Sequence, residues 1–185
     1  FLLRICELIY RNLLISEDSG LSKFRDFVQD RDQMAYLYEN FVRTFYATHT
    51  DFKVSREDIQ WRWVASDDTA KAMLPKMQTD ISLLSQTRRI IIDCKYTPEA
   101  TKSHYEAVKL RSSHLYQINA YMENLQRGPY IDTCEMMLLY PTVETPLALE
   151  YTHNQHRISI KTINLNQPWQ GIHADLLEIV TQLLK

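Results

Sequence analysis

The sequence predicts a mixed α/β domain in which helices cover both faces of a central sheet. The spacing of apolar residues predicts helices, then three strands, a helix, further strands and a closing helix. The uninterrupted run Ile90-Ile91-Ile92 is typical of a strand buried on both faces. With 185 residues, 45% of them hydrophobic, the chain is long and apolar enough for one globular core.

The first segment, residues 1–31, is expected to be a helical lead-in. Apolar residues recur at helical spacing from Phe1 to Ile15, and Ser22 is placed to cap a short helix over 23–29. Because the sequence opens at Phe1 inside a helical pattern, we interpret 1–31 as following a further N-terminal region. Residues 32–185 are expected to form the main domain.

The next elements are a helix and three strands. Residues 32–46 predict a helix with Asp32 as its N-cap, because apolar side chains recur at intervals of three and four. Alternation around Trp61 and Trp63 predicts a strand over 59–65, with the two tryptophans in the core. Residues 76–84 and 89–96 predict two further strands, the second at the centre of the sheet.

The second half of the chain adds a helix, three strands and a last helix. A polar stretch over 97–103 is expected to be a loop, and residues 112–125 predict a helix. Residues 133–140 predict a buried strand. The segments 147–151 and 157–164 predict an antiparallel pair around the turn 152–156, and a helix is expected over 171–184.

Composition excludes several classes of protein. No stretch is long and uncharged enough to cross a membrane. Three scattered cysteines without a C-x-x-C pattern favour buried thiols in the cytoplasm over disulfides or a zinc site. The net charge of -2 argues against nucleic-acid binding by bulk electrostatics alone. The phosphate-binding pattern G-x-x-x-x-G-K-[S/T] is absent, so nucleotide hydrolysis would need another chain.

The segment Lys76 to Lys95 carries the candidate chemistry. Asp93 and Lys95 lie two positions apart on one predicted strand, so their side chains leave the same face. If the two strands form a hairpin centred between Gln86 and Thr87, paired residues have numbers that sum to 173. Asp80 then lies opposite Asp93.

Two opposed carboxylates at a Cβ separation of about 5 Å repel each other and need a compensating charge. A divalent cation supplies it, and Mg²⁺, or Mn²⁺ in its place, accepts two carboxylates plus water. Lys95 would then stabilise the charge that develops as a metal-activated water attacks a phosphodiester. The pattern therefore predicts Asp80 and Asp93 as metal ligands and Lys95 as a catalytic lysine.

These residues resemble a known nuclease family. Asp80, followed by Asp93-Cys94-Lys95 after a hydrophobic strand, is similar to the PD-(D/E)XK motif. The segments LPKMQTDI and IIDCKY look like the form of this motif in the McrC subunits of McrBC restriction systems, although Thr79 stands where the generic motif has proline. The resemblance implies a restriction-endonuclease-like core, a central mixed sheet flanked by helices, over 32–185.

The same resemblance implies further roles. Glu39, on the helix that includes Leu37-Tyr38-Glu39-Asn40, corresponds to a helix glutamate that completes the metal site in such nucleases. Gln117 and Tyr121 look like the Gln-x-x-x-Tyr element of RecB-like nucleases and are expected to support the site. The implied activity is Mg²⁺-dependent endonuclease cleavage of double-stranded, methylated DNA. The implied partner is a hexameric McrB-like AAA+ GTPase.

Some residues are candidates for contacts with DNA. Basic side chains after the catalytic strand could bind phosphates: these are Lys102, Lys109, Arg111 and His114, with His104 beside them. Trp61 and Trp63 could stack bases instead of entering the core. His153 and His156 are expected in a solvated turn.

Two other functions remain open at this point. One is a non-catalytic scaffold that docks on and stimulates an AAA+ GTPase, although a scaffold has no need of two opposed carboxylates. The other is a RecB-like exonuclease or repair nuclease, which the Gln-x-x-x-Tyr element allows. Cleavage of a covalently closed circle separates an endonuclease from an exonuclease, which needs an end.

Overall fold

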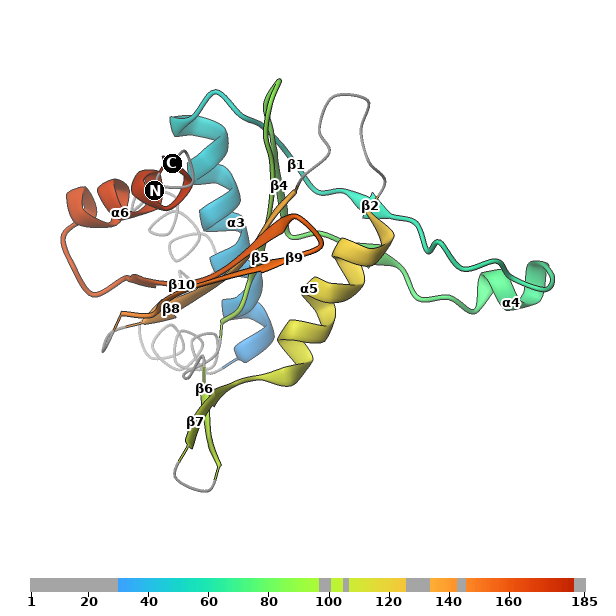
Figure 1. Ribbon diagram of the computed structural model, residues 1–185. Coiled ribbons are helices and arrows are strands. Elements are labelled where there is room, and N and C mark those ends of the chain that lie inside the picture. The colour runs from blue at the N-terminus through green and yellow to red at the C-terminus, as the bar shows by residue number, and fades with distance from the viewer. Residues whose placement is uncertain (1–29, 97–100, 105–106, 126–133, 143–145, 182–185) are drawn as a thin grey trace, which may run out of the picture.

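The computed structural model describes residues 30–96, 101–104, 107–125, 134–142 and 146–181, and only the backbone of 101–104 and 107–109. The helices expected over 1–15 and 23–29 lie outside the described residues. Figure 1 shows a twisted sheet with helices on either side.

Six strands form the central sheet. From one edge to the other they are β1 (Lys53–Ser55), β4 (Ile81–Leu84), β5 (Arg89–Cys94), β8 (Glu135–Thr142), β10 (His156–Asn164) and β9 (Ala148–His153). The pairs β5/β8 and β8/β10 are parallel, and the other three pairs are antiparallel. The predicted mixed sheet is confirmed, and β5 lies in its interior.

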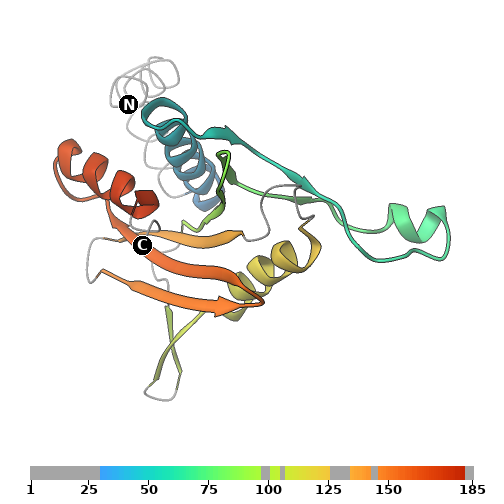
Figure 2. The ribbon, with the colours of Figure 1, turned by 45° about the horizontal axis from the view of Figure 1, so that its top comes forward.

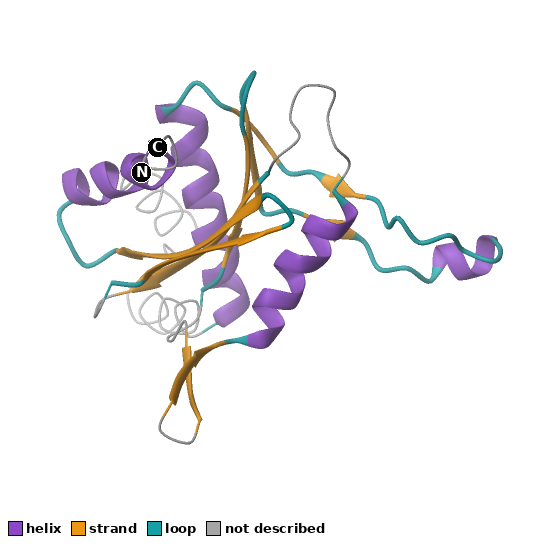
Figure 3. Ribbon diagram, viewed as in Figure 1, coloured by secondary structure: helices purple, strands orange, loops and turns teal. Residues whose placement is uncertain are grey.

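Helices cover the two faces, as Figure 3 shows. Helices α3 (Arg31–His49) and α6 (Trp169–Thr181) pack on one face, and α5 (Ser112–Asn124) packs on the other. The isoleucine run of β5 serves both cores, because Ile90 and Ile92 join the α3/α6 side while Ile91 joins the α5 side. This architecture agrees with the restriction-endonuclease-like α/β core that the sequence predicts.

Several element boundaries differ slightly from the prediction. Helix α3 begins at Arg31, because Asp30 and not Asp32 is the N-cap: its carboxylate accepts hydrogen bonds from the backbone N–H groups of Asp32 and Gln33. Helix α6 begins at Trp169, two residues earlier than expected. The β9–β10 hairpin is confirmed; its turn residues Asn154 and Gln155 have φ angles of 48° and 68°.

Residues 56–80, here called the arm, depart most from the prediction. The arm leaves the body through β2 (Asp58–Ile59), carries the short helix α4 (Asp68–Ala72) and returns through β3 (Met77–Gln78). Figure 2 shows it projecting away from the sheet. The strand predicted over 59–65 therefore ends at Ile59, and Trp63 is 66% exposed instead of entering the core.

The strand predicted over 76–84 is two strands, β3 and β4. The break falls at Thr79, whose backbone N–H donates to the carbonyl of Glu57 instead of a sheet neighbour of β4. The loop predicted over 97–103 is also wrong at its end. Its last residues belong to β6 (Thr101–His104), which pairs with β7 (Ala107–Leu110). Hydrogen bonds between backbone groups form this hairpin, and polar side chains do not prevent them.

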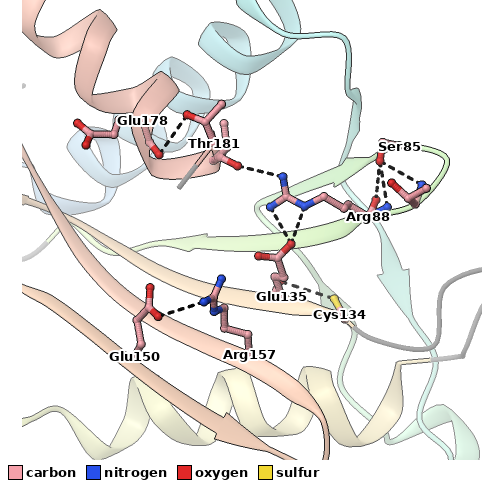
Figure 4. A network of polar contacts seen from close by, with 10 residues as sticks. Ser85, Arg88, Cys134, Glu135, Glu150, Arg157, Glu178 and Thr181 are labelled. Carbon is pink, nitrogen blue, oxygen red and sulfur yellow. Dashed lines mark hydrogen bonds and ion pairs between the residues drawn. The ribbon is translucent and has the colours of Figure 1, made fainter. Parts of the chain in front are cut away.

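The hairpin of β4 and β5 is fastened at its turn by Arg88, as Figure 4 shows. The Arg88 guanidinium donates through Nε to Glu135 Oε1 at 2.8 Å and through Nη1 to the carbonyl of Val180 at 3.0 Å, and its Nη2 forms an ion pair with Glu135 Oε1 at 2.7 Å. The Ser85 hydroxyl accepts a hydrogen bond from the backbone N–H of Arg88. One side chain thus ties the turn to β8 and to α6.

Candidate active site

The register of the β4–β5 hairpin brings the two predicted acids together. Its paired residues run from Ile81 opposite Ile92 to Leu84 opposite Arg89, so the numbers of each pair sum to 173. The register predicted from the sequence is therefore confirmed. Continued by one residue, the same register sets Asp80 opposite Asp93.

Asp80 is held by the strand that it faces. Its Oδ2 accepts a hydrogen bond of 2.8 Å from the backbone N–H of Cys94, the residue after Asp93. This bond fixes the Asp80 carboxylate at the end of β5. The sheet itself thus positions the first acid.

Thr79 fixes the backbone just before Asp80. Its N–H donates to the Glu57 carbonyl, and its hydroxyl accepts from the Glu57 N–H, both at 2.9 Å. The hydroxyl also lies 3.0 Å from the Ser82 hydroxyl, and Thr79 is fully buried. A proline has neither the N–H nor the hydroxyl that these contacts use, so the threonine has a physical role of its own here.

Asp93 and Lys95 form an ion pair on the α5 side of the sheet. The distance from Lys95 Nζ to Asp93 Oδ2 is 2.7 Å, and the Asp93 side chain is fully buried. Neither Asp93 oxygen accepts a well-aligned hydrogen bond from the part of the chain that the structure describes. Asp93 Oδ1, which takes no part in the ion pair, is therefore available to a further positive ligand.

The environment of the acids opposes their ionisation. Burial raises the pKa of Asp93 to about 7; the Lys95 charge lowers it, and the charges of Asp80 and Glu39 raise it further. Burial also raises the pKa of Asp80, against the hydrogen bond from Cys94. Burial, more than the mutual repulsion of the acids, therefore opposes their ionised forms.

Glu39 lies close enough to the acids to interact with them. It is half-buried on α3, and burial followed by the charge of Asp80 raises its pKa. Two arginines oppose this effect: Arg43, which donates to the Asp80 carbonyl at 3.5 Å, and Arg56, which donates to the Thr79 carbonyl at 3.4 Å. The sequence interpretation missed both arginines. The i, i+4 spacing of Glu39 and Arg43 could have indicated the first, but no pattern indicates the second.

A chain of hydrogen bonds orients Lys95. Its Nζ donates to Gln117 Oε1 at 2.7 Å, and Gln117 Nε2 donates to the Tyr121 hydroxyl at 2.7 Å. The Tyr121 hydroxyl in turn donates to the Gln78 carbonyl at 2.9 Å. The two α5 residues singled out in the sequence thus meet the end of β5, and they hold the lysine beside Asp93.

The donor set at this site fits a hard divalent cation. Mg²⁺ takes one or two protein carboxylates and fills its remaining positions with water and substrate phosphate oxygens. Asp80 and Asp93 supply such a pair, and Asp93 Oδ1 has no hydrogen-bond partner in the described chain. Within the described residues, no group of three or more His, Cys, Asp or Glu side chains could hold a metal ion. The pair would therefore depend on water and phosphate to complete the shell.

The residues predicted to contact phosphates lie at one end of this side of the sheet. The backbone register of the β6–β7 hairpin sets Lys102 opposite Lys109, and Arg111 stands at the N-terminus of α5. His114 is half-buried, with Nδ1 2.8 Å from the Tyr140 hydroxyl. Phosphate binding by these residues stays a prediction.

Other residues singled out in the sequence lie elsewhere. His153 belongs to β9, whereas His156 opens β10 and accepts a 2.9 Å hydrogen bond from the Cys134 N–H, so it is not a solvated turn residue. Cys94 and Cys134 are buried thiols, as expected, and Cys6 lies outside the described residues. No described helix has the length and apolar character that crossing a membrane requires.

Comparison with known proteins supports an assignment. The family described as "McrBC 5-methylcytosine restriction system component" matches residues 1–141. The chain is also 30% identical over 188 residues to a protein of Escherichia coli (strain K12) named "Type IV methyl-directed restriction enzyme EcoKMcrBC". That alignment covers 100% of this chain and 53% of the relative, so the chain spans about half the length of the relative.

Proposed function

Because the chain belongs to the McrBC family of 5-methylcytosine restriction system components, we propose that it is the part that cuts DNA, as a Mg²⁺-dependent endonuclease of the PD-(D/E)XK type. The observation that carries the proposal is the hairpin register, which sets Asp80 and Asp93 against each other beside Lys95. Such an arrangement is costly for folding alone, since the burial of like charges is unfavourable. A binding function accounts for it.

The residues of the chain divide the work in this proposal. Asp80 and Asp93, with Glu39 nearby, would hold the cation, which when bound would polarise a phosphate and activate a water. Lys95 stabilises the negative charge that develops on the phosphate in the transition state. Gln117 and Tyr121 limit the positions that the lysine can take, which reduces the entropy lost on reaching the reactive geometry.

Recognition and energy supply are assigned to other parts of the complex. The net charge of -2 and the absence of a phosphate-binding loop fit a catalytic part that depends on partners to bring DNA to it. We infer that an McrB-like AAA+ GTPase hexamer hydrolyses GTP and that methylated double-stranded DNA is the substrate. The printed name of the relative, a methyl-directed restriction enzyme, supports this choice.

Metal binding and cleavage test the proposal separately. Calorimetric titration of Mg²⁺ is expected to give binding in the wild type and none in Asp93→Ala, with Ca²⁺ as a non-catalytic ion. A covalently closed, methylated circle, incubated with the GTPase partner and GTP, is expected to be linearised by the wild type alone. An intact circle beside degraded linear DNA would indicate an exonuclease. Stimulated GTP hydrolysis without metal binding or cleavage would indicate a scaffold.

The hydrogen-bond chain to Lys95 gives a finer prediction. Tyr121→Phe removes the hydroxyl that holds Gln117, so the lysine loses its orientation while its charge stays. We expect the cleavage rate constant to fall by up to about a hundredfold, the scale of a misplaced catalytic group, with KM and the affinity for Mg²⁺ unchanged. A parallel loss of Mg²⁺ affinity would contradict this, because it would mean that Tyr121 supports the fold of the metal site and not the lysine.

A further inference from the structure

The root of the arm holds Trp61 in one orientation. The indole N–H of Trp61, on the outgoing segment of the arm, donates to the carbonyl of Pro75, on the returning segment, at 2.6 Å. The next residue is also fixed, because the backbone N–H of Arg62 donates to the side chain of Asn124, which is buried at the end of α5. The Trp61 ring is thus pre-positioned, while the arm beyond it extends away from the body (Figure 1).

A hollow of about 330 Å³ lies between the arm root and α5. Its lining residues are Trp61, Lys76, Met77, Gln78, Gln117, Ala120 and Tyr121. The volume is at the lower end of the range for small-molecule sites, roughly 300 Å³ and above. Two lining residues, Gln117 and Tyr121, are those that orient Lys95, so an occupant of the hollow lies next to the candidate catalytic lysine.

The chemistry of the walls selects a flat, heteroaromatic occupant. Trp61 contributes a large π-surface, the best of any side chain for stacking on a ring. The amides of Gln78 and Gln117 already bond Asp58 on one side and Lys95 and Tyr121 on the other, and the second N–H of each amide can donate to the edge of such a ring. A nucleobase has these properties, and it is the only aromatic ring system in DNA.

A second, larger hollow makes a poorer site for DNA. It has a volume of about 650 Å³, shares Trp61, Lys76 and Met77 with the smaller hollow, and extends along the arm past Trp63, whose ring centroid is 4.8 Å from that of Trp61. Three carboxylates, those of Asp58, Asp67 and Asp68, line it and would repel phosphates. The smaller hollow has no carboxylate among its lining residues.

We propose that the hollow between the arm root and α5 binds one nucleobase of the substrate DNA, stacked on Trp61, after that base has left the helical stack. The proposal rests on the proposed nuclease function for the identity of the ligand. A base inside a duplex cannot reach a pocket of this kind, so the enzyme must accept a locally unpaired nucleotide or extrude one. Base binding beside the cut site would then align the scissile phosphate with Asp93 and Lys95.

Fluorescence anisotropy of a labelled oligonucleotide tests the proposal without cleavage. The full chain, with EDTA present, is titrated into a short single-stranded DNA and into a matched abasic strand of equal charge. Trp61→Ala is expected to weaken binding of the normal strand by about five- to hundredfold, the range for loss of one base–aromatic stack, and to leave binding of the abasic strand unchanged. Trp61→Phe is expected to retain most of the affinity.

A second variant guards against misfolding of the first. Ala120→Leu keeps Trp61 and fills the hollow from α5, and it is expected to give the same selective loss as Trp61→Ala. Tyr151→Ala, which removes a 48% exposed aromatic from the edge strand β9, is the matched control and is expected to bind like the wild type. Equal affinity of the wild type, Trp61→Ala and Ala120→Leu for the normal strand would overturn the base site.

The outcome for the base site is separate from the outcome for the nuclease. Because EDTA removes divalent ions, the difference in affinity between the normal and the abasic strand reports base binding without metal or cleavage. A protein that shows Trp61-dependent binding but never cuts DNA would overturn the nuclease and keep the base site. A protein that cuts DNA equally well with and without Trp61, and binds both strands alike, would overturn the base site and keep the nuclease.

Discussion

At the residue scale, the fold disfavours the ionised form of the Asp93 carboxyl. Its pKa rises from 3.8 to about 7 in the fold, because burial outweighs the ion pair with Lys95. The folded protein therefore favours the protonated carboxyl. Protonated Asp93 makes its full contribution to the free energy of unfolding below the pKa that this group has in the unfolded chain. That contribution is lost as the pH rises towards 7.

This gives a prediction for the metal-free protein. The free energy of unfolding is expected to fall between pH 4 and pH 7, with a contribution from Asp93 of at most about 1.4 kcal/mol per pH unit, shared with Asp80 because the two titrate together. Asp93→Asn removes the ionisable group and should flatten this slope. Urea unfolding in EDTA at several pH values measures it; equal slopes for the two proteins would refute the assigned shift.

Thr79 leads to a prediction at the same scale. Thr79→Val keeps the shape but leaves the Glu57 N–H without its acceptor, at a cost of about 1–3 kcal/mol in stability. Because Thr79 fixes the backbone next to Asp80, the affinity for Mg²⁺ should fall as well. Thr79→Ser retains the hydroxyl and should restore both quantities. Calorimetry and urea unfolding check the series, and a valine variant with wild-type Mg²⁺ affinity would show that the clamp does not act on Asp80.

At the scale of elements, the β4–β5 hairpin depends on the ion pair and hydrogen bonds of Arg88 at its turn. Arg88 and Glu135 are both largely buried, with 15% and 17% of their side chains exposed. Removal of one partner leaves a charge without compensation, so Arg88→Met is expected to cost about 3 kcal/mol. The double variant Arg88→Met/Glu135→Leu should recover at least half of that loss.

A double-mutant cycle from urea unfolding measures this coupling. A control is Arg157→Met, since Arg157 forms a more exposed pair with Glu150 at 3.4 Å, and its loss should cost under about 1 kcal/mol. Equal costs for the two arginines would contradict the idea that burial makes the Arg88 pair stronger.

The elements also show what the sequence can predict. The β4–β5 register follows from the positions of the acids and the centre of the turn, both of which are local. Helices α3, α5 and α6 follow from apolar periodicity, which packing against a sheet enforces. The break at Thr79 does not follow, because its cause is a hydrogen bond to Glu57, 22 residues away.

For the candidate site the same division holds. Asp80, Asp93 and Lys95 follow from strand geometry, whereas Gln117 and Tyr121 were singled out only through a family resemblance. Arg56 and the orientation of Trp61 depend on where the arm folds back, which no local pattern encodes. The sequence pattern did not predict the arm, because its outgoing and returning segments pair at only two positions, Asp58 with Gln78 and Ile59 with Met77.

At the scale of the whole molecule, the outer arm contributes little to folding. Helix α4 has no buried residue, and Trp63, Val64 and Met73 are 66%, 99% and 79% exposed. Replacement of 63–74 by a short Gly-Ser linker is therefore expected to change the free energy of unfolding by less than about 1 kcal/mol, as for other exposed segments. Urea unfolding measures this, and a large loss would mean that the outer arm packs on the body in solution.

The junction of the arm with β4 has a consequence for the energetics of the whole complex. The return strand of the arm passes through Thr79 directly into Asp80, so a ligand that displaces the arm root also changes the separation of the two acids. Occupancy of the arm and occupancy of the acid pair are then thermodynamically linked. Linkage is reciprocal: the factor by which DNA raises the affinity for the cation is the factor by which the cation raises the affinity for DNA.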